Sequence, residues 1–358
     1  MSTLIPPPLR DDCFSLPAGV DWAPVADAHA LLRDRLQPMT ERETVPVTLA
    51  LGRVLSQDAV AQRSNPPLPN TAVDGDGMAH SALQDGAQVM PLIKGRAVAG
   101  LRFDGVVPHG QAIRILTGAA LPDGVDTVVL QEDVTLGDGE IAFHGPLKPG
   151  ANTRKAGEDV TQGDVALPVG RKMTPADIAL LTAVGIAEVE TFRPLRVAVI
   201  STGDELLPAG APAEPGQIYD ANRPMLLGMA ERLGFEPIDI GHIADDRNAL
   251  SAALDRAADH ADVILTSGGA SAGDEDHVSA LLEDTGSMAM WRIAIKPGRP
   301  LALALWKGTP VFGLPGNPVA ALVCALVFAR PAMGLMAGEG WAEPRRYTVP
   351  AAFSKNKK

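Results

Sequence analysis

Aromatic side chains are scarce in this chain, since Phe, Trp and Tyr make up only 4% of its 358 residues. The apolar fraction is nevertheless 46%, so Ala, Val and Leu must fill the cores, and the length is sufficient for two or three domains. Only two cysteines are present, Cys13 and Cys324, and they do not have the spacing of a zinc site. A disulfide scaffold is therefore not expected, and reduced thiols in a cytoplasmic compartment fit better.

Basic residues are also in deficit. The chain has 31 Lys and Arg against 43 Asp and Glu, which gives a formal net charge of -12. Binders of duplex nucleic acid usually carry a basic face, so no nucleic-acid partner is expected. The N-terminus lacks an apolar segment of signal-peptide length, and the chain has no uninterrupted apolar run of about 18 residues. We therefore predict a cytoplasmic protein without a membrane partner.

Turn signals and apolar periodicity divide the chain into parts. Residues 60–152 combine short apolar segments with closely spaced Gly, Pro and Asp turns, which is typical of a small β-barrel. From Arg196 onward, apolar strands alternate with helices, and this pattern predicts a doubly wound, mostly parallel sheet covered on both faces. The tail predicts one further strand, at 346–349. The predicted helices span 24–36, 174–184, 222–233, 247–258, 277–284 and a stretch from Pro318.

A loop rich in Gly and Ser follows the apolar strand predicted at 263–266. It reads S-G-G-A-S-A-G-D over 267–274. Glycine allows backbone N–H groups to approach an anion, and the two serines add hydroxyl donors. Because ligands of wound sheets bind at the carboxyl ends of strands, we predict a phosphate site here. A βα turn that only needs flexibility is the alternative.

Acidic residues lie at the ends of neighbouring strands. Glu205 closes I-S-T-G-D-E, Asp245 lies in H-I-A-D-D-R, and Asp274 and Asp276 end the serine-containing loop. Hard oxygen ligands near a phosphate loop are the usual way to hold Mg²⁺. We therefore predict Mg²⁺ at Asp245, Asp274 and Asp276, with helix capping as the alternative wherever such an acid precedes a helix.

Two proline-containing turns complete this region. K-P-G-R-P at 296–300 holds Lys296 and Arg299 in a rigid turn, which suggests an anion clamp. L-P-G-N-P at 314–318 leads into an apolar helix whose first turn leaves N–H groups open to an anion. A purely structural turn would explain the second motif as well.

Together these segments resemble the molybdopterin molybdenumtransferase family. The matching motifs follow the family's order from about residue 10 to 330, and many ordered motifs are specific where one Gly-rich loop would be weak. They are D-G-x-G-x-A, I-L-T-G-A-x-L-P-x-G-x-D-x-V-V, G-E-D, S-T-G-D-E-L, G-Q-I-Y-D-A-N-R, S-G-G-x-S-x-G-D, I-K-P-G-R-P and G-L-P-G-N-P.

The resemblance implies an enzyme that inserts molybdate into adenylylated molybdopterin and releases AMP and molybdenum cofactor, with Mg²⁺ as the auxiliary ion. It implies a homodimer whose cleft joins the α/β domain of one subunit to other domains of its partner. Contacts with a molybdopterin adenylyltransferase and with molybdoenzyme chaperones are also expected. The implied fold is a multidomain α/β plus β protein with an elongated mixed domain (1–52 and 153–173), an inserted β-barrel (53–152), an α/β domain (174–335) and a truncated C-terminal β-barrel (340–358).

The resemblance also implies site residues. The catalytic ones are Asp74, Thr117, Asp159, Glu205, Asp245, Asp276 and Lys296. The substrate-binding ones are Gly203, Ser267, Gly268, Gly269, Ser271, Asp274, Arg292, Gly298, Arg299, Pro315, Gly316, Asn317 and Pro318. Two positions depart from the family pattern, because Asp76 replaces an aromatic residue and Arg292 replaces a lysine. On physical grounds alone, Asp74 and Thr117 would be ordinary turn residues.

Two other functions remain open from the sequence. An adenylyltransferase-like enzyme would use the same α/β domain, with ATP and molybdopterin as substrates. A non-catalytic scaffold or cofactor carrier similar to gephyrin would bind without turnover.

Overall fold

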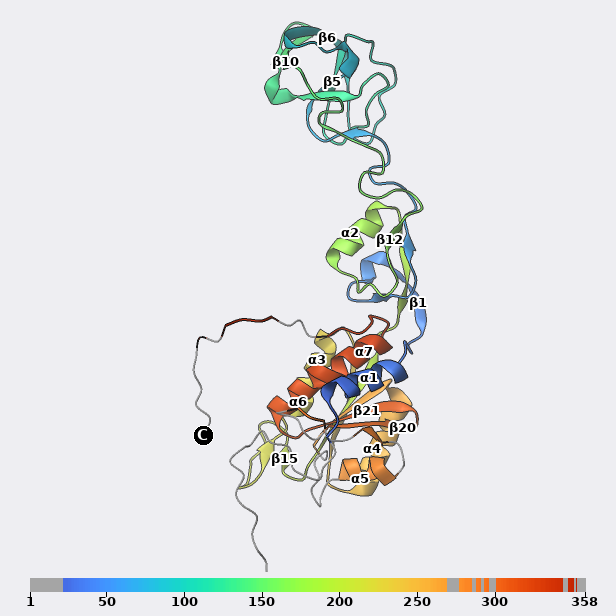
Figure 1. The fold of residues 1–358 in the computed structure, drawn as a ribbon, viewed down its shortest axis with the longest axis vertical. Helices are drawn as coiled ribbons and strands as arrows, with labels where there is room; N and C mark the ends of the chain where they lie inside the picture. Colours follow the sequence, from blue (N-terminus) through green and yellow to red (C-terminus); the bar gives the residue numbers. More distant parts are fainter. Residues whose placement is uncertain are drawn as a thin grey trace, which may run out of the picture.

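The computed structural model describes residues 22–268, 277–284, 288–290, 293–295, 301–343, 347–350 and 352. Figure 1 shows three units in a row, with a β-rich unit at one end, a small mixed unit in the middle and an α/β unit at the other end. Most of the described residues that were predicted for the site belong to the α/β unit.

The α/β unit is built on a six-stranded sheet with the order β17-β14-β18-β21-β20-β19. The first four strands in this order are parallel, β20 is antiparallel to β21, and β19 is antiparallel to β20. The strands are β14 (Arg196–Thr202), β17 (Glu236–Ile243), β18 (Val263–Ser267), β19 (Met288–Met290), β20 (Ala302–Trp306) and β21 (Thr309–Leu314). The chain passes from β14 to β17 on one side and then to β18 on the other, so the topological switch point lies between β14 and β18.

Helices cover both faces of this sheet, as predicted. Successive residues of β14 alternate between two cores, with Val197 and Val199 in one and Ala198 and Ile200 in the other, as the two-residue period of a strand requires. In Figure 1, α3 and α6 lie on one side of the sheet, and α4 and α5 lie on the other. These helices are α3 (Asn222–Arg232), α4 (Arg247–His260), α5 (His277–Asp284) and α6 (Pro318–Cys324).

Residues 318–336 form one apolar helical stretch made of α6, the π-helical η4 (Ala325–Ala329) and α7 (Arg330–Met336). By length and composition alone it would be able to cross a membrane, but 61% of its 18-residue apolar window is buried inside the protein, as in a core helix. The helix expected at 24–36 is α1 (Val25–Arg35), and its Ala28 and Leu32 pack in the same core as Phe328.

The mixed unit contains the sheet β1-β13-β2 and the strand pair β12-β3. Its elements are β1 (Arg42–Pro46), η1 (Val47–Leu49), β2 (Val54–Leu55), β3 (Ala59–Val60), β12 (Val165–Leu167), α2 (Pro175–Ala183) and β13 (Glu188–Phe192). The predicted start of α2 is confirmed by a capping box, in which Thr174 Oγ1 accepts from Asp177 N and the Asp177 carboxylate accepts from Thr174 N at 2.8 Å.

Packing places two helices in units other than those we expected. α2 was expected in the α/β domain, but its Leu181 shares a core with Val47 and Leu55 of the mixed unit. Conversely, α1 was expected in the mixed domain and packs on the α/β unit. The cause is the same in both cases, because each helix buries its apolar face against a partner distant in sequence.

The β-rich unit contains a six-stranded sheet with the order β8-β5-β7-β6-β10-β9. Its strands are β5 (Gly75–Met78), β6 (Gly86–Ala97), β7 (Ala112–Ile115), β8 (Thr127–Leu130), β9 (Thr135–Leu136) and β10 (Glu140–Gly145), with η2 (His80–Ala82), η3 (Gln131–Asp133) and the pair β4 (Asn70–Thr71) and β11 (Thr153–Arg154) beside it. A Cβ on Gly75 would lie 1.9 Å from the carbonyl oxygen of Val129, so β5 approaches β8 this closely only because residue 75 is glycine.

The prediction of a strand at 346–349 is wrong for those residues of the range that the structure describes. Residues 347–350 form no strand, and Tyr347 and Val349 are 76% and 75% exposed. A strand needs a neighbour to pair with its backbone groups, and in the described part of the tail no ladder is formed.

Candidate active site

A cavity of about 300 Å³ opens at the carboxyl ends of β14, β18 and β21, next to the switch point. Six of the predicted site residues line this cavity. Its lining consists of Thr202, Glu205, Leu206, Ile218, Tyr219, Asp220, Ala221, Asn222, Ser267, Gly268, Gly316, Asn317 and Pro318. Leu206 and Tyr219 come from a small parallel pair, β15 (Leu206–Leu207) and β16 (Ile218–Tyr219). The location is the one expected for a ligand of a wound sheet.

Asn222, the first residue of α3, holds the floor of this cavity together. Its Nδ2 donates to Ser267 Oγ and to the carbonyl oxygen of Gly316, both at 2.7 Å. One side chain therefore ties the end of β18 to the loop that follows β21. Its own Oδ1 and the hydroxyl of Thr202 are buried and have no hydrogen-bond partner among the described residues. Such orphaned polar atoms are rare in folded proteins and are satisfied here if a polar ligand binds.

Gly268 is required by its backbone conformation and by its surroundings. Its φ is +94°, and a Cβ at this position would lie 2.4 Å from the carbonyl oxygen of Thr202. Only glycine allows the chain leaving β18 to pass this close to the end of β14.

Asp220 fixes the approach to α3. It is buried, and its carboxylate accepts from Ser201 Oγ at 2.6 Å and from Arg223 Nε at 2.9 Å. Burial alone raises the pKa of Asp220, but the hydrogen bonds from Ser201 and Arg223 outweigh it and hold the pKa below the usual value. The residue is therefore a structural anion beneath the cavity.

The acidic residues after β14 and β17 bind each other's backbone. Asp204 N donates to Asp245 Oδ2 at 3.1 Å, and Asp245 N donates to Asp204 Oδ1 at 3.0 Å. The next residue, Asp246, caps α4 by accepting from Ala249 N at 2.7 Å, so this acid of the H-I-A-D-D-R motif has the capping role. No three His, Cys, Asp or Glu side chains within the described ranges form a cluster able to hold a metal ion.

The predicted acids of the first half of the chain lie elsewhere. Asp74 Oδ1 accepts from Thr117 Oγ1 at 2.6 Å and from Thr117 N at 2.7 Å, and these bonds, the hydroxyl first, lower the pKa of Asp74. Asp159 accepts from Arg154 at 3.0 and 3.1 Å and from Asn65 at 3.2 Å. Figure 1 shows the β-rich unit at the opposite end of the molecule from the α/β unit. A single chain therefore does not bring Asp74 and Thr117 to the cavity.

Comparison with known proteins identifies the family. Residues 23–185 match the model of the MoeA N-terminal region (domain I and II), and residues 198–334 match that of a probable molybdopterin binding domain. A molybdopterin molybdenumtransferase of Haemophilus influenzae is 38% identical over 332 residues, which cover 92% of this chain and 82% of the relative. The chain belongs to the molybdopterin molybdenumtransferase family. The resemblance inferred from the motifs is thereby confirmed.

Other members of the molybdenumtransferase family agree. Molybdopterin molybdenumtransferase 2 of Mycobacterium tuberculosis H37Rv is 37% identical over 313 residues, covering 82% of this chain and 75% of the relative. Two crystal structures of the molybdopterin biosynthesis MoeA protein of Pyrococcus horikoshii are 33% and 31% identical, with TM-scores of 0.74 and 0.76. Each covers 89% of this chain, and this chain covers 81% and 80% of the two structures.

Several predicted residues lie outside the described ranges, so the structure gives no geometry for them. They are Gly269, Ser271, Asp274, Asp276, Arg292, Lys296, Gly298 and Arg299. Of the others, Glu205, Ser267, Gly268, Gly316, Asn317 and Pro318 line the cavity. Gly203 and Pro315 lie beside lining residues on the loops after β14 and β21, whereas Asp245 lies after β17 on a loop that contributes no lining residue. Asn317 also caps α6 by accepting from Ala320 N at 3.1 Å.

Of the lining residues that sequence reasoning missed, three have the hydrogen-bonding features described above, namely Thr202, Asp220 and Asn222. Two of them belong to G-Q-I-Y-D-A-N-R, a motif that contributed to the resemblance but from which no residue was selected. The signal was an acid and an amide at the start of a helix that follows a short strand.

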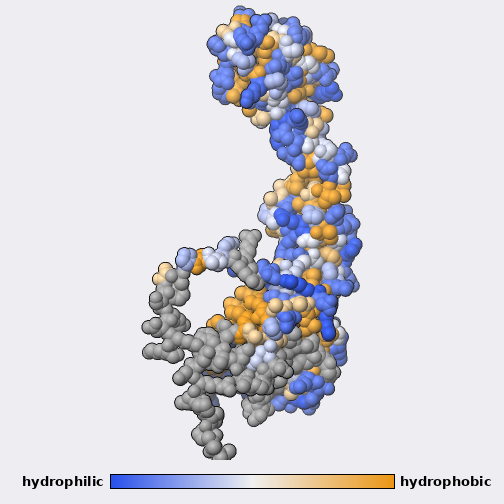
Figure 2. Space-filling view, viewed as in Figure 1, coloured by the Kyte–Doolittle hydropathy of each residue, from blue (hydrophilic) through white to orange (hydrophobic). Residues whose placement is uncertain are grey.

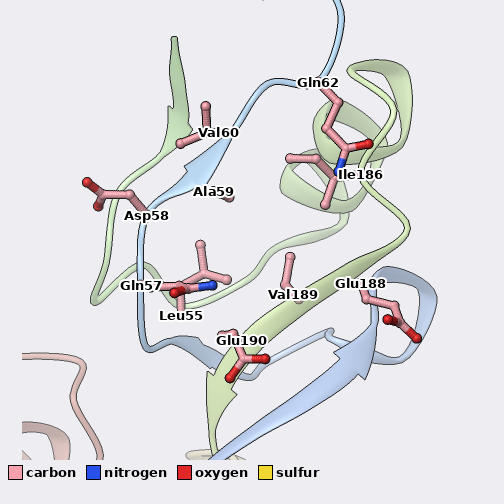
Figure 3. A pocket seen from close by; sticks show the side chains of 10 residues that line it. All are labelled: Leu55, Gln57, Asp58, Ala59, Val60, Gln62, Ile186, Glu188, Val189 and Glu190. Atoms are coloured by element: carbon pink, nitrogen blue, oxygen red, sulfur yellow. The ribbon is translucent and has the colours of Figure 1, made fainter. Parts of the chain in front are cut away.

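A second cavity, of about 320 Å³, lies in the mixed unit. Figure 3 shows Asp58, Glu188 and Glu190 around it, with apolar side chains such as Leu55 and Val189 between them. Neither cavity has Lys or Arg in its described lining, but this one also lacks the Ser, Thr and Gly residues of the α/β cavity and contains none of the predicted site residues. Three acids without such donors disfavour a phosphorylated ligand, so the α/β cavity is the better candidate.

Proposed function

We propose that this protein transfers molybdenum from molybdate to adenylylated molybdopterin, with release of AMP and formation of molybdenum cofactor. The observation that carries the proposal is the polar cavity at the switch point, within the segment that matches a probable molybdopterin binding domain. The names of the relatives support the same reaction.

The cavity offers groups suited to a phosphorylated ligand. Ser267 Oγ accepts from Asn222, so its own hydrogen remains available for donation to a phosphate oxygen. The orphaned Thr202 hydroxyl is a second donor, and Asn222 Oδ1 is an acceptor for an N–H or O–H of the ligand. Lys296 and Arg299 are proposed to add positive charge from the neighbouring turn and to bind molybdate or phosphate. Ser271 and the glycines Gly269 and Gly298 are proposed to belong to the same binding loops.

We propose that the enzyme is a homodimer in which Asp74, Thr117 and Asp159 of one subunit serve the cavity of its partner. Two observations support this arrangement. The β-rich unit is remote from the cavity of its own chain (Figure 1). In addition, Val319, Leu322 and Leu326 expose 63%, 36% and 36% of their surface on one side of the helix that begins at the cavity, and Figure 2 shows an apolar patch there. Contacts with an adenylyltransferase or with chaperones stay expectations of the resemblance.

Mg²⁺ is proposed as the auxiliary ion. The described residues would supply this ion with one carboxylate oxygen, Asp245 Oδ1, because Asp245 Oδ2 already accepts from Asp204 N. The other coordination positions would remain open to other ligands. Magnesium typically uses one or two carboxylates together with water and substrate phosphates. Asp245 would hold the ion with Asp274 and Asp276, and Glu205 and Arg292 are proposed to contact the substrate. When bound, the ion would offset negative charge on the phosphates.

Release of AMP tests the proposed function. Purified protein is incubated with adenylylated molybdopterin, molybdate and Mg²⁺, and AMP is quantified by chromatography. We expect molybdate-dependent AMP release. A folded protein that binds the substrate without releasing AMP would instead support the carrier or scaffold, and formation of adenylylated pterin from ATP and molybdopterin would support the adenylyltransferase.

Subunit mixing tests the shared site. Two variants are each expected to retain only a small, measurable fraction of the parent activity, namely Asp74→Asn in the β-rich unit and Asn222→Asp in the cavity. A mixed dimer of the two would contain one cavity with both parts intact, so we expect recovery of about a quarter to a half of the parent activity per dimer. Mixing that restores nothing, although mass spectrometry shows heterodimers, would refute a site shared between subunits.

A further inference from the structure

A carboxylate is buried without a hydrogen bond in the β-rich unit. Asp76, in the middle of β5, is 0% exposed, and neither of its carboxylate oxygens has a hydrogen-bond partner among the residues that the structure describes. Across the ladder it is paired with Arg114 of β7, whose Nη1 lies 3.7 Å from Asp76 Oδ2. Burying such a charge is costly even when a partner is present. Stability alone therefore gives no reason for an acid at this position.

Arg114 connects this acid to the Asp74–Thr117 pair. Its Nη2 donates to Gln131 Oε1 at 2.5 Å, and the backbone N of Gln131 donates to the carbonyl oxygen of Asp74 at 3.1 Å. Asp74 in turn accepts both hydrogen bonds from Thr117. The contacts form a continuous path from β5 through β7 and η3 back to the residue that precedes β5.

We propose that Asp76 is a positioning residue that, through Arg114 and Gln131, holds Asp74 and Thr117 in place for the reaction. This inference rests on the function proposed above. Asp76 orients the guanidinium by charge, the guanidinium fixes the Gln131 side chain, and Gln131 fixes the backbone of Asp74. A planar guanidinium suits this role because its donors point in fixed directions toward two partners at once.

The charge of Arg114 also reaches the site directly. Besides the hydrogen bonds of Thr117, which are the main cause, the charge of Arg114 contributes to the lowered pKa of Asp74. If Arg114 turned toward solvent, Asp74 would lose this support and its backbone anchor would loosen. Small misplacements of this kind are known to reduce turnover strongly, with about a hundredfold loss for 1 Å.

The proposal makes activity and stability respond differently to Asp76→Asn. The variant keeps the shape of the side chain and removes a buried charge, which relieves the desolvation penalty. The Arg114 side chain is 28% exposed, so without its counter-charge it turns toward solvent, where it stays hydrated, and its bond to Gln131 is no longer held in place. If Asp76 had only a structural role, its replacement would lower the stability and the activity of the protein together.

The experiment measures kcat and KM for AMP release, and Tm, in Asp76→Asn. We expect kcat to fall by about tenfold or more, KM to change by less than about twofold, and Tm to equal or exceed that of the parent. The matched control is Arg102→Gln, which breaks an exposed ion pair with Asp123 in the same unit and is expected to leave all three quantities unchanged. An unchanged kcat in Asp76→Asn, or a loss of kcat that follows a loss of Tm, would overturn the proposal.

A double-mutant cycle tests whether Asp76 acts through Asp74. Adding Asp76→Asn to Asp74→Asn should bring no further loss of kcat, because the positioned group is already disabled. A full additional loss would show that Asp76 acts independently and would overturn the path. The absence of AMP release by the parent protein would remove the proposed function, whereas an active parent with an unimpaired Asp76→Asn variant would remove only the role of Asp76.

Discussion

Replacing Asp262 by Asn should destabilise the α/β unit at neutral pH and leave its stability unchanged in strong acid. Asp262 lies just before β18, and its side chain is only 7% exposed. Its carboxylate accepts from Arg193 at 2.6 and 2.8 Å and from the backbone N of Arg196 at 2.8 Å. Asn preserves the volume but loses the charge that attracts both guanidinium groups, so the start of β18 is held less firmly beside the start of β14.

The expected magnitude follows from the pKa of this carboxyl. Burial raises the pKa of Asp262, but the hydrogen bonds from Arg193 and Arg196 outweigh it, and the pKa falls from 3.8 to about 2. At about 1.4 kcal/mol for each pKa unit, this corresponds to roughly 2.5 kcal/mol. Because the folded-state pKa is lowered, this stabilisation is fully present above about pH 4 and is lost as the pH falls toward about 2.

Tryptophan fluorescence during urea unfolding measures this effect selectively. The four Trp residues are at positions 22, 291, 306 and 341, and none lies in the segment 42–192 that forms the other two units. We expect the free energy of unfolding of Asp262→Asn to be about 2 to 3 kcal/mol below the parent at pH 7, with the difference shrinking below pH 4.

A surface ion pair in the same unit provides the control. Asp284 bonds to Arg247 with its side chain 60% exposed, so Asp284→Asn should cost less than about 1 kcal/mol. If Asp262→Asn costs no more than this control, or if its cost is the same at pH 3 as at pH 7, the assignment of the stabilisation to the charged carboxylate is refuted.

Three further outcomes are expected at the cavity and in the core. Gly268→Ala should weaken AMP binding measured by calorimetry by about tenfold or more, since its Cβ would meet the carbonyl oxygen of Thr202 at 2.4 Å and its φ is +94°; unchanged affinity would remove this loop from the site. Asn222→Asp should lower the free energy of unfolding by about 1 to 3 kcal/mol, because a carboxylate oxygen then faces the carbonyl oxygen of Gly316 at the position of a buried hydrogen bond, whereas the Ser267 hydroxyl can turn to donate to it; a stability equal to that of the parent in urea titrations would contradict the clamp. Burial raises the pKa of the Cys324 thiol to about 12, so mass spectrometry should find it unmodified by iodoacetamide at pH 8 until urea unfolds the protein, and rapid native labelling would contradict this burial.

Local signals in the sequence predicted the elements of this fold well. The helix start predicted at 174 and the apolar strand predicted at 263–266 both depend on neighbours within a few residues, and the structure confirms them. The partners of each element depend on distant residues. α2 and α1 were assigned to the wrong cores because an apolar helix face does not encode which sheet it will cover. The packing of Ala28 with Phe328 joins residues far apart along the chain.

The site was predictable to a similar extent. Glycine and serine at the end of β18 indicated the cavity, because their chemistry is local. The role of Asn222 was not readable, since its two partners come from the ends of two other strands. Nor does any local pattern reveal that Asp74 lies in a unit remote from that cavity, because this follows from the elongated arrangement of the units (Figure 1).

The two ends of β14 and β18 divide stability from binding. At their amino ends every oxygen of Asp262 is paired with a guanidinium or a backbone N–H, and such saturation holds the strands in register. At their carboxyl ends the Thr202 hydroxyl and Asn222 Oδ1 are buried without a partner among the described residues. An unpaired buried polar atom costs free energy that is recovered when a bound ligand or an ordered water supplies the missing hydrogen bond. Because the amino ends of the two strands are firmly paired, their carboxyl ends can keep polar atoms free to bind a ligand. Asp262→Asn should therefore reduce ligand affinity less than it reduces the stability of the sheet.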